Sequence, residues 1–294
     1  MSAAIVLMAY GSPERLADVP EYYADIRGGR PIRPELLEDL VERYRRLGIE
    51  DGSPLNAITE ATRAALERAL GDVPVFTGMK HWTPRIADAA DAAVASGAEM
   101  VIGLVLAPHY SSMSIAGYQQ QLEGALDGRA ELAFIESWHD EPGFIDLLAE
   151  RVRGTDAHVV FTAHSLPARI LESGDPYKDQ LLETSQLVAD RAALESWSFS
   201  FQSESQTGEP WLGPDILDHL QELHGRGIRE VLVCPVGFVA DHLEIRWDLD
   251  HEAVEQAEAL GLGFRRIEMP NDDPAFVEVL AGLVRRVLAV PSEA

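Results

Sequence analysis

The sequence has one cysteine, Cys234, among 294 residues. A single thiol cannot form a disulfide within the chain, and it cannot complete a four-cysteine zinc site or hold an iron–sulfur cluster. Cys234 lies inside the apolar run VLVCP, where a free cysteine usually serves as a small buried side chain. We therefore expect no iron–sulfur cluster and no thiolate-based metal site.

Basic residues are also scarce: 24 Lys and Arg stand against 49 Asp and Glu, which gives a formal net charge of -25. Nucleic acids and anionic membrane surfaces bind clustered positive charge, so neither is an expected partner. The apolar runs stop at about eight residues, far short of the roughly twenty that a membrane-spanning helix needs. No basic segment with a cleavage site precedes the first apolar run. We expect a cytoplasmic protein without an integral membrane segment.

Short apolar runs alternate with segments of helical periodicity, and this order occurs twice. The first half holds four runs with the composition of buried strands: Ile5–Ala9, Val73–Thr77, Met100–Ala107 and Leu132–Glu136. From His158 the order repeats, because HVVFTAHSLP corresponds to AIVLMAYGSP and VLVCPVG to GLVLAPH. Alternating strands and helices form parallel sheets. We predict an α/β fold of two similar doubly wound lobes, 1–153 and 154–294, each with a four-stranded parallel sheet flanked by helices.

Several polar side chains follow these runs. Tyr10 and His109 follow runs of the first half, whereas His164 and Glu244 follow runs of the second half. Ligands of parallel sheets bind outside the carboxyl ends of the strands. We therefore expect the two lobes to face one cleft, with these residues at its edge.

An acidic stretch follows the run VLVCP. Glu244, Asp248 and Glu252 are four residues apart, so in a helix their carboxylates lie along one face. Such a stripe is either a solvated surface, with Asp241 and Glu244 as a capping pair, or a site for a cation. His164 also has two interpretations, since a histidine after a strand is often structural. If His164 and Glu244 face each other, the pair can bind a divalent ion such as Fe(II) weakly enough to release it, and can accept protons near neutral pH.

Uncommon motifs occur along the whole chain in a fixed order: AYGSP, SPLNAIT, GMKHWTP, LAPHYSS, AHSLP, FQSESQTGEPWLGPDI and PVGFVADHLE. In these motifs and their order the sequence resembles the ferrochelatases. The resemblance implies a class I chelatase-like fold and the insertion of Fe(II) into a porphyrin with release of two protons. It assigns His164 and Glu244 to the catalytic and metal-insertion centre, and leaves Asp248 and Glu252 as an entry path or outer metal site. It implies no cofactor beyond the substrate Fe(II).

Tyr10 narrows the resemblance to one subgroup. A tyrosine after the first strand is similar to the coproporphyrin III ferrochelatases of Gram-positive bacteria, in which its oxygen ligates the product iron on the face opposite the catalytic histidine. Arg27, Arg43, Ser53 and Tyr118 match the residues that contact the substrate propionates in that subgroup, and a guanidinium suits carboxylates. The resemblance thus implies the formation of coproheme in haem biosynthesis from the porphyrin and Fe(II), with transient contact to a coproheme decarboxylase.

Other interpretations stay open from the sequence. The same chemistry could use protoporphyrin IX, or insert cobalt or nickel into another tetrapyrrole, and a non-catalytic tetrapyrrole or metal carrier could use the fold as a clamp. Tyr10 could be a buried aromatic residue, and Arg27 and Arg43 exposed surface charges. Arg27 also lies in Tyr22–Gly29, whose aromatic residues and paired glycines are typical of a mobile segment. The lack of a hydrophobic amino-terminal lip or a cysteine-bearing tail favours a monomer.

Overall fold

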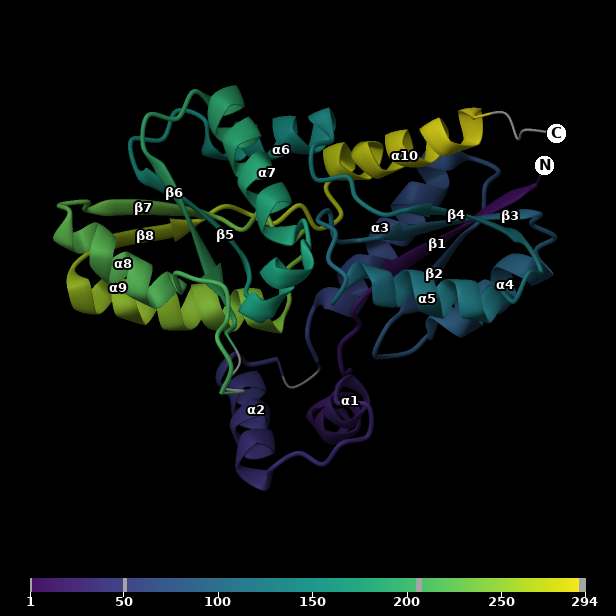
Figure 1. Cartoon of the computed structure of the whole chain (residues 1–294), viewed down its shortest axis with the longest axis horizontal. Helices are drawn as coiled ribbons and strands as arrows, with labels where there is room; N and C mark the ends of the chain where they lie inside the picture. The colour runs from purple at the N-terminus through teal and green to yellow at the C-terminus, as the bar shows by residue number, and fades with distance from the viewer. Residues whose placement is uncertain (1, 50–51, 205–207, 291–294) are drawn as a thin grey trace.

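The computed structural model describes residues 2–49, 52–204 and 208–290 of the chain. Figure 1 shows two layered lobes side by side, with a smaller helical extension below them in the view. Asp51, two residues before the motif SPLNAIT, and residues 205–207, in the motif FQSESQTGEPWLGPDI, lie outside the described residues. Within the described part of the chain, no helix has both the length and the apolar character that crossing a bilayer requires.

The first lobe contains a parallel sheet with the strand order β2-β1-β3-β4. Its strands are β1 (Ala3–Ala9), β2 (Val75–Met79), β3 (Met100–Val105) and β4 (Glu131–Ile135). Ile5 of β1 is paired with Val75 on one side and with Ile102 on the other. The central strand is almost wholly apolar because helices cover both faces of the sheet, so that β1 is buried from its second residue to its last.

The second lobe repeats this arrangement with the strand order β6-β5-β7-β8. Its strands are β5 (His158–His164), β6 (Trp197–Gln202), β7 (Glu230–Cys234) and β8 (Gly263–Arg266), all parallel. β1 and β5 occupy the same place in their sheets, as the repeated sequence pattern predicts. The predicted fold class of two similar four-stranded parallel lobes flanked by helices is confirmed, and Cys234 is buried as expected.

Helices flank both sheets. They are α3 (Leu55–Leu70), α4 (Ile86–Ala95), α5 (Ile115–Leu126), α6 (Pro142–Val152), α7 (Tyr177–Ala192), α8 (Ile216–Gly225), α9 (Val254–Leu260) and α10 (Pro274–Ala289). α4 packs against α5 in the first lobe, and α8 packs against α9 in the second. Pro142 and Pro274 begin α6 and α10, because proline costs nothing at a position whose N–H has no partner within the helix.

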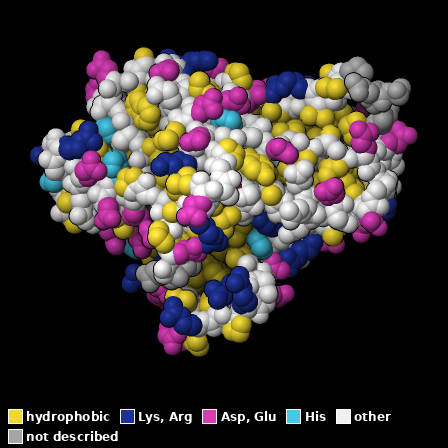
Figure 2. Space-filling model, in the orientation of Figure 1, with side chains coloured by type: hydrophobic (Ala, Val, Ile, Leu, Met, Phe, Trp, Pro, Cys, Tyr) yellow, Lys and Arg dark blue, Asp and Glu magenta, His cyan; other side chains and the backbone are white. Residues whose placement is uncertain are grey.

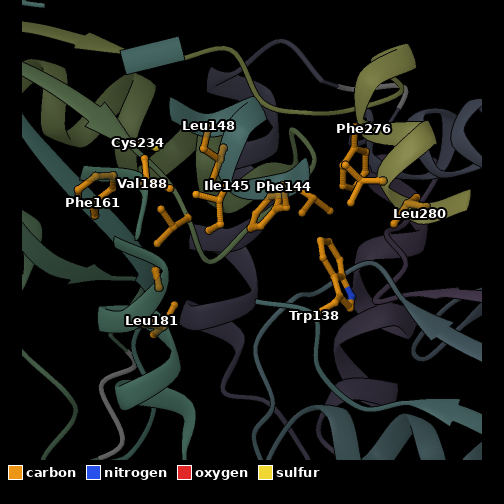
Figure 3. Close-up of a cluster of buried hydrophobic side chains, with 14 of the residues drawn as sticks. Trp138, Phe144, Ile145, Leu148, Phe161, Leu181, Val188, Cys234, Phe276 and Leu280 are labelled. Carbon is orange, nitrogen blue, oxygen red and sulfur yellow. The ribbon is translucent and has the colours of Figure 1, made fainter. Parts of the chain in front are cut away.

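The last helix of each lobe crosses to the other lobe. α6 ends the first repeat and packs against α7 of the second, whereas α10 ends the second repeat and packs against α3 of the first (Figure 1). One hydrophobic cluster consequently runs through both lobes, and its members include Trp138, Phe144, Phe161, Leu181 and Phe276 (Figure 3). Because the cluster has members in both lobes, the two lobes share one core. Burial of each such side chain contributes roughly 1.5–3 kcal/mol to stability. The division into 1–153 and 154–294 stays a prediction.

A helical extension leaves the first lobe between β1 and α3. It consists of a 3-10 turn (Leu16–Asp18), α1 (Val19–Ile26) and α2 (Pro34–Arg46), and Val19, Tyr44 and Ile49 form its small core. The sequence predicted a mobile segment at Tyr22–Gly29, but most of that segment is helix α1. The reason is Tyr22, which is buried and whose hydroxyl donates a hydrogen bond to the Gly11 carbonyl at 2.9 Å.

Candidate active site

The carboxyl end of β5 places His164 at the edge of the second sheet. The turn after it is fixed because Ser165 donates its backbone N–H to the Gln202 carbonyl at 2.7 Å and its hydroxyl to the Leu212 carbonyl at 2.7 Å. Nδ1 of His164 is hydrogen-bonded to the Ser165 carbonyl, so this nitrogen carries a proton. The other ring nitrogen, Nε2, is therefore the one that can exchange a proton with a substrate.

Glu244 faces this nitrogen from the start of a π-helix, Ile245–Ala253, that continues into α9. One of its carboxylate oxygens lies 3.6 Å from Nε2 of His164 and 3.6 Å from Nε2 of His242. His242 donates from Nδ1 to the Ala240 carbonyl at 3.0 Å, so it too presents Nε2 to the carboxylate. Two imidazoles thus flank one carboxylate. His242 is not among the predicted site residues, although its place two residues before Glu244 in PVGFVADHLE is a signal that could have found it.

The charges in this group depend on one another. Burial opposes a positive charge on His164, but the charge of Glu244 and the hydrogen bonds to Glu244 and Ser165 outweigh it and raise the pKa of His164 to about 9. Burial likewise opposes a negative charge on Glu244, yet His164 and His242 hold the pKa of its carboxyl well below its usual range. At neutral pH the resting pair is therefore an imidazolium beside a carboxylate.

Asp248 lies next along the same side of the π-helix. Its buried carboxyl accepts hydrogen bonds from the Ser203 hydroxyl and from Nε2 of Gln202, the latter at 3.4 Å. Burial and the charge of Glu244 raise the pKa of Asp248 to about 7, although the bond from Ser203 acts in the opposite direction and the charge of Glu252 adds to the rise. Asp248 is thus close to half protonation at neutral pH. This suits a group that takes up and releases protons.

The acidic segment is not the regular α-helix that its spacing suggested. Its hydrogen bonds run from residue i to i+5, a rare pattern that is frequently found at functional sites. The interpretation of Asp241 and Glu244 as a capping pair is wrong. Asp241 accepts hydrogen bonds from Arg266 at 3.0 Å and from Asn271 at 2.9 Å, whereas Glu244 faces the two histidines.

Tyr10 forms the first-lobe side of the cleft. It directly follows β1, and its ring lies 4.6 Å from the ring of His81. The side chain is 42% exposed, yet burial among protein groups, and then the charges of Glu244 and Asp25, raise the pKa of its hydroxyl. Tyr10 thus lies at the carboxyl edge of the first sheet, near enough to the second lobe for the charge of Glu244 to act on its hydroxyl. Figure 2 shows a recess with hydrophobic side chains where the extension meets the two lobes.

Lys80 and His81, from the motif GMKHWTP, belong to this first-lobe wall. The Lys80 ammonium donates to the Ser114 carbonyl at 3.1 Å and lies 4.6 Å from the ring centre of Tyr118. Tyr118 is buried in α5, and this burial raises the pKa of its hydroxyl. His81 is hydrogen-bonded to Asp25 of α1 at 2.9 Å, which ties the extension to the first lobe.

Arg27, Arg43 and Ser53 belong to the extension and to the segment that returns from it. Arg27 follows the last residue of α1, and its guanidinium donates to a backbone carbonyl in the turn that follows. Arg43 pairs with Asp39 at 3.1 Å and lies 5.0 Å from the ring centre of Trp247, so it contacts the π-helix of the second lobe. Ser53 is buried. Contacts of these residues with substrate propionates stay predictions.

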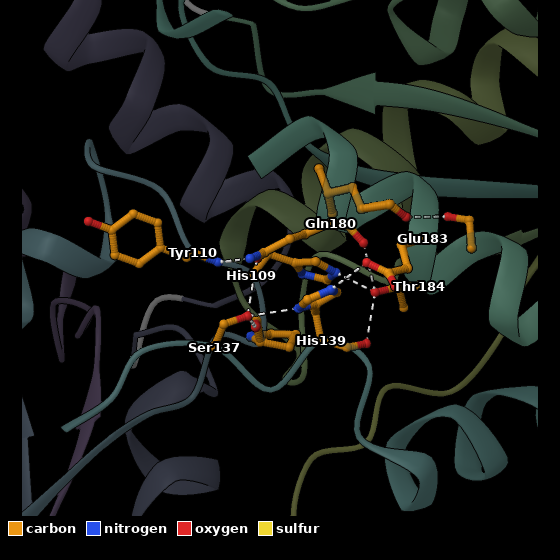
Figure 4. A network of polar contacts seen from close by, with 10 residues as sticks. His109, Tyr110, Ser137, His139, Gln180, Glu183 and Thr184 are labelled. Atoms are coloured by element: carbon orange, nitrogen blue, oxygen red, sulfur yellow. Dashed lines mark hydrogen bonds and ion pairs between the residues drawn. The ribbon is translucent and has the colours of Figure 1, made fainter. Parts of the chain in front are cut away.

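His109 lies in a polar seam between the lobes and faces α7. We use "seam" for the contacts of His109, Tyr110, Ser137 and His139 with α7 (Figure 4). Nε2 of His109 lies 2.9 Å from the Thr184 hydroxyl, and burial, followed by the neighbouring His139, holds the pKa of His109 well below its usual range. His109 is therefore a neutral structural histidine.

The metal-binding capacity of the cleft is small. Across residues 2–49, 52–204 and 208–290, no group of three or more His, Cys, Asp or Glu side chains is arranged to hold a metal ion. His164 and Glu244 together offer a divalent ion one nitrogen and one carboxylate. Such a partial ligand set suits an ion that is delivered and then removed.

Proteins of known family are similar to this chain over almost its whole length. A family model described as Ferrochelatase matches residues 2–288. This chain belongs to the ferrochelatase family. A ferrochelatase from Herpetosiphon aurantiacus is 44% identical over 299 residues, which cover 96% of this chain and 97% of that protein. A coproporphyrin III ferrochelatase from Listeria innocua is 40% identical over 299 residues, with 95% of this chain and 96% of the relative covered.

Solved structures agree with the family's two-lobed fold. SirB from Bacillus subtilis with Fe3+ has a TM-score of 0.64 at 12% identity, and covers 98% of this chain and 96% of its own. CbiX, described as the terminal enzyme for biosynthesis of siroheme in denitrifying bacteria, has a TM-score of 0.56 at 15% identity, with 99% and 100% covered. At these identities the likeness shows the fold alone, and it supports the predicted class I chelatase-like architecture.

Proposed function

We propose that this protein inserts Fe(II) into coproporphyrin III to form coproheme, with release of two protons, and that His164 and Glu244 carry the reaction. The observation that carries the proposal is the contact between these two side chains at 3.6 Å, with Tyr10 of the first lobe near enough for the charge of Glu244 to act on it. Membership of the ferrochelatase family supports iron insertion into a porphyrin as the reaction class.

The rigidity of the cleft favours insertion. A flat porphyrin offers its nitrogens poorly, because two of them carry protons and all lie in the plane of the macrocycle. A cleft that binds a bent macrocycle more tightly than a flat one lowers the barrier to insertion by differential binding. The crossing of α6 and α10 supplies this rigidity, since it joins both walls of the cleft to one hydrophobic core.

His164 is the proton acceptor in this mechanism. In the resting pair its Nε2 is protonated, because Glu244 helps to raise the pKa of His164 to about 9 against the effect of burial. An Fe(II) ion that reaches Glu244 cancels the charge that holds this proton, so His164 releases it. The free Nε2 can then accept the proton of one pyrrole nitrogen, and after passing it on it can accept the proton of the second. Glu244 thus couples the arrival of the metal to the basicity of His164.

Asp248 and Glu252 provide an exit for the protons. Asp248 has a pKa raised to about 7, chiefly by burial and by Glu244, so it can take up and release a proton near neutral pH. A carboxyl group that is half protonated is a poor metal ligand, because metals bind the deprotonated form. We therefore favour a proton path at Asp248 and Glu252 over an outer metal site.

The choice of coproporphyrin III is supported by Tyr10 and by the cations of the extension. A substrate with four propionates needs local positive charge in a protein with a net charge of -25, and Arg27 and Arg43 are partly exposed at the extension. Ser53 and Tyr118 complete the proposed propionate contacts. Tyr10 would ligate the product iron from the face opposite His164. Relatives at 38–40% identity carry the name coproporphyrin III ferrochelatase, whereas those at 44% and 42% carry the plain family name.

A side-by-side assay decides between the two porphyrins. Purified protein is given anaerobic Fe(II) with coproporphyrin III or with protoporphyrin IX, and kcat/KM is measured for each. We expect a higher kcat/KM for coproporphyrin III. Equal or reversed values would favour the protoporphyrin IX enzyme, and binding of both without insertion would favour a non-catalytic tetrapyrrole or metal carrier.

We further propose that the protein works as a cytoplasmic monomer, needs no resident cofactor or iron–sulfur cluster, and passes coproheme to a coproheme decarboxylase by transient contact. The single buried Cys234 supports the lack of a cluster. Metal analysis of the purified protein and its elution volume on size exclusion test the first two points. Iron and sulfide in fixed proportion to protein would contradict the second.

A further inference from the structure

One carboxylate joins the two lobes close to the catalytic histidine. Asp175 of the second lobe is 8% exposed and lies just before α7. Its Oδ2 accepts hydrogen bonds from the Ser111 hydroxyl at 3.1 Å, the Ser112 backbone N–H at 2.7 Å and the Ser112 hydroxyl at 2.6 Å, all in the loop after β3 of the first lobe. Its Oδ1 accepts the backbone N–H of Tyr177 at 3.0 Å. Both oxygens are therefore bound to backbone N–H groups, one from each lobe.

Tyr177 extends this connection to His164. Its side chain is buried, and its hydroxyl donates a hydrogen bond to the His164 carbonyl at 3.0 Å. The next carbonyl, that of Ser165, is bound by the His164 imidazole itself. Tyr177 of α7 thus fixes the peptide groups that orient the imidazole. Asp175 in turn attaches the start of α7 to the first lobe.

The seam of Figure 4 holds the lobes together independently of Asp175. The Tyr110 N–H donates to the Gln180 side chain at 2.7 Å, and His109 contacts Thr184 at 2.9 Å. With the shared hydrophobic core, these contacts keep α7 in place when Asp175 is altered. Loss of the Asp175 carboxylate should therefore move the His164 turn locally without separating the lobes.

We propose that Asp175 is a positioning residue for metal insertion: through Tyr177 it fixes the imidazole of His164 relative to the first-lobe wall that carries Tyr10. The proposal rests on the proposed role of His164 as proton acceptor. Placement matters because a general base must lie within hydrogen-bond reach of the proton that it removes. Asp175 itself is too buried among its four partners to contact the porphyrin.

The main test is Asp175→Asn. An amide presents one oxygen and one NH2 group, so whichever way it is turned, a donor meets either the Ser112 or the Tyr177 backbone N–H. We expect kcat for iron insertion to fall on the order of 10- to 100-fold, the cost of small misplacement of a reacting group. The Kd for the porphyrin, from fluorescence quenching, should stay within about twofold, because a positioning residue acts on the chemical step.

Tyr177→Phe separates positioning from lobe contact. It removes the hydroxyl bound to the His164 carbonyl and leaves all four hydrogen bonds to Asp175. We expect a smaller fall in kcat, a shifted pH profile of kcat, and an altered titration of the His164 imidazole in NMR spectra, assigned as the resonance that His164→Ala lacks. Asp146→Asn is the matched control, since Asp146 of α6 pairs with Arg191 of α7 at the surface; it should behave as wild type.

The outcomes distinguish the proposals. Wild-type kcat and wild-type His164 titration in Asp175→Asn would overturn the positioning role. If Asp175→Asn does not fold, Tyr177→Phe decides, and unchanged kcat and titration there overturn it as well. A fall in kcat that follows only the loss of folded protein, measured by thermal unfolding, would reduce Asp175 to a structural residue. If wild-type protein inserts no iron, the proposed function fails, whereas the His164 titrations still test the positioning.

Discussion

The two ends of β5 carry histidines in opposite states. His158, at the amino end, is hydrogen-bonded at Nδ1 to the Ser196 hydroxyl at 2.6 Å and at Nε2 to the Ser198 hydroxyl at 2.8 Å. Burial, with smaller effects of Arg226 and His219, lowers the pKa of His158 to about 4. His164, at the carboxyl end of the same strand, has its pKa raised to about 9 against the effect of burial, chiefly by Glu244.

Burial alone would lower the pKa of both histidines, so the difference comes from what each end of the sheet brings near the ring. At the amino end the partners are hydroxyl groups, which bind a neutral imidazole and leave it neutral. At the carboxyl end the loops converge, and the π-helix places a carboxylate 3.6 Å from the ring. The same side chain is therefore a neutral bridge between hydroxyl groups at one end and a charged partner of a carboxylate at the other.

The largest expected difference between the two histidines is the effect of replacing each one on the rate of iron insertion. His164→Ala should reduce iron insertion by roughly 10²–10⁴-fold, because proton removal loses its general base, while porphyrin binding survives in the remaining cleft. Insertion assays with anaerobic Fe(II), together with porphyrin fluorescence quenching, measure the two effects. His158→Gln is the matched control on the same strand, and folded protein of this variant should insert iron at the wild-type rate. Normal turnover by His164→Ala would remove His164 from the mechanism.

Glu244→Gln should lower the pKa of His164 below its ordinary value, as burial does for His158. Without the carboxylate, burial dominates at His164, so its pKa should fall from about 9 to below the ordinary value of about 6.5. NMR titration of the imidazole resonances measures this shift, and the pH profile of kcat should move with it. We expect insertion to fall by about 100-fold, since metal arrival no longer changes the basicity of His164. A His164 pKa that stays near 9 in this variant would show that Glu244 is not the cause.

His158 and His164 should also make the free energy of unfolding depend on pH in opposite directions. His158 has its folded pKa lowered from 6.5 to about 4, so its neutral contacts stabilise the fold above pH 6.5 and are lost as the pH falls toward 4. Because His158 is buried, this loss can reach about 3 kcal/mol of unfolding free energy. His164 has its folded pKa raised to about 9, so its contribution is present below pH 6.5 and is lost as the pH rises through 9.

Urea unfolding at a series of pH values tests these signs. The acid slope should be shallower in His158→Gln than in wild type, whereas the alkaline slope should be shallower in His164→Ala. Carboxylates add to the acid slope in both proteins, so the difference between variant and wild type is the quantity to compare. An acid slope unchanged by His158→Gln would contradict the neutral state of His158.

The smallest expected effect is at Arg226. This exposed arginine lowers the pKa of His158 through its charge, after burial. Arg226→Gln should therefore raise the pKa of His158 slightly and change the unfolding free energy by less than about 0.5 kcal/mol. NMR titration of His158 in low salt and in about 1 M salt measures this effect, which screening should abolish at the higher salt. A shift that persists in high salt would point to lost packing.

The strands and their order could be predicted because buried parallel strands have a strong local signal. The runs at β1, β5 and β7 are short and apolar and are repeated in order, so they fix the sheets without any knowledge of packing. Tyr10 and His164 could be placed at the same edge for the same reason. The motifs around Glu244 predicted its pairing with His164, but no spacing gives a distance of 3.6 Å or the resulting charge state.

Three features depended on packing and could not be predicted. The spacing of Glu244, Asp248 and Glu252 fits an α-helix as well as the observed π-helix, and the choice depends on burial of Trp247 and Asp248 against the rest of the fold. The motif PVGFVADHLE brings His242 near Glu244 in the sequence, but the direction of its ring toward the carboxylate depends on packing. The apolar faces of α6 and α10 indicate that both helices are buried, but they do not say against which sheet.

The crossing of α6 and α10 means that neither repeat is a self-sufficient protein. A single repeat released from the other would expose the apolar face of its terminal helix, together with the apolar face of the helix that the other repeat's terminal helix covers. Exposed apolar area of that size drives association, so such a fragment would pair with a second copy by exchanging its terminal helix. Co-expression of the two halves as separate chains should accordingly yield a complex of the two, whereas either half alone should associate with itself.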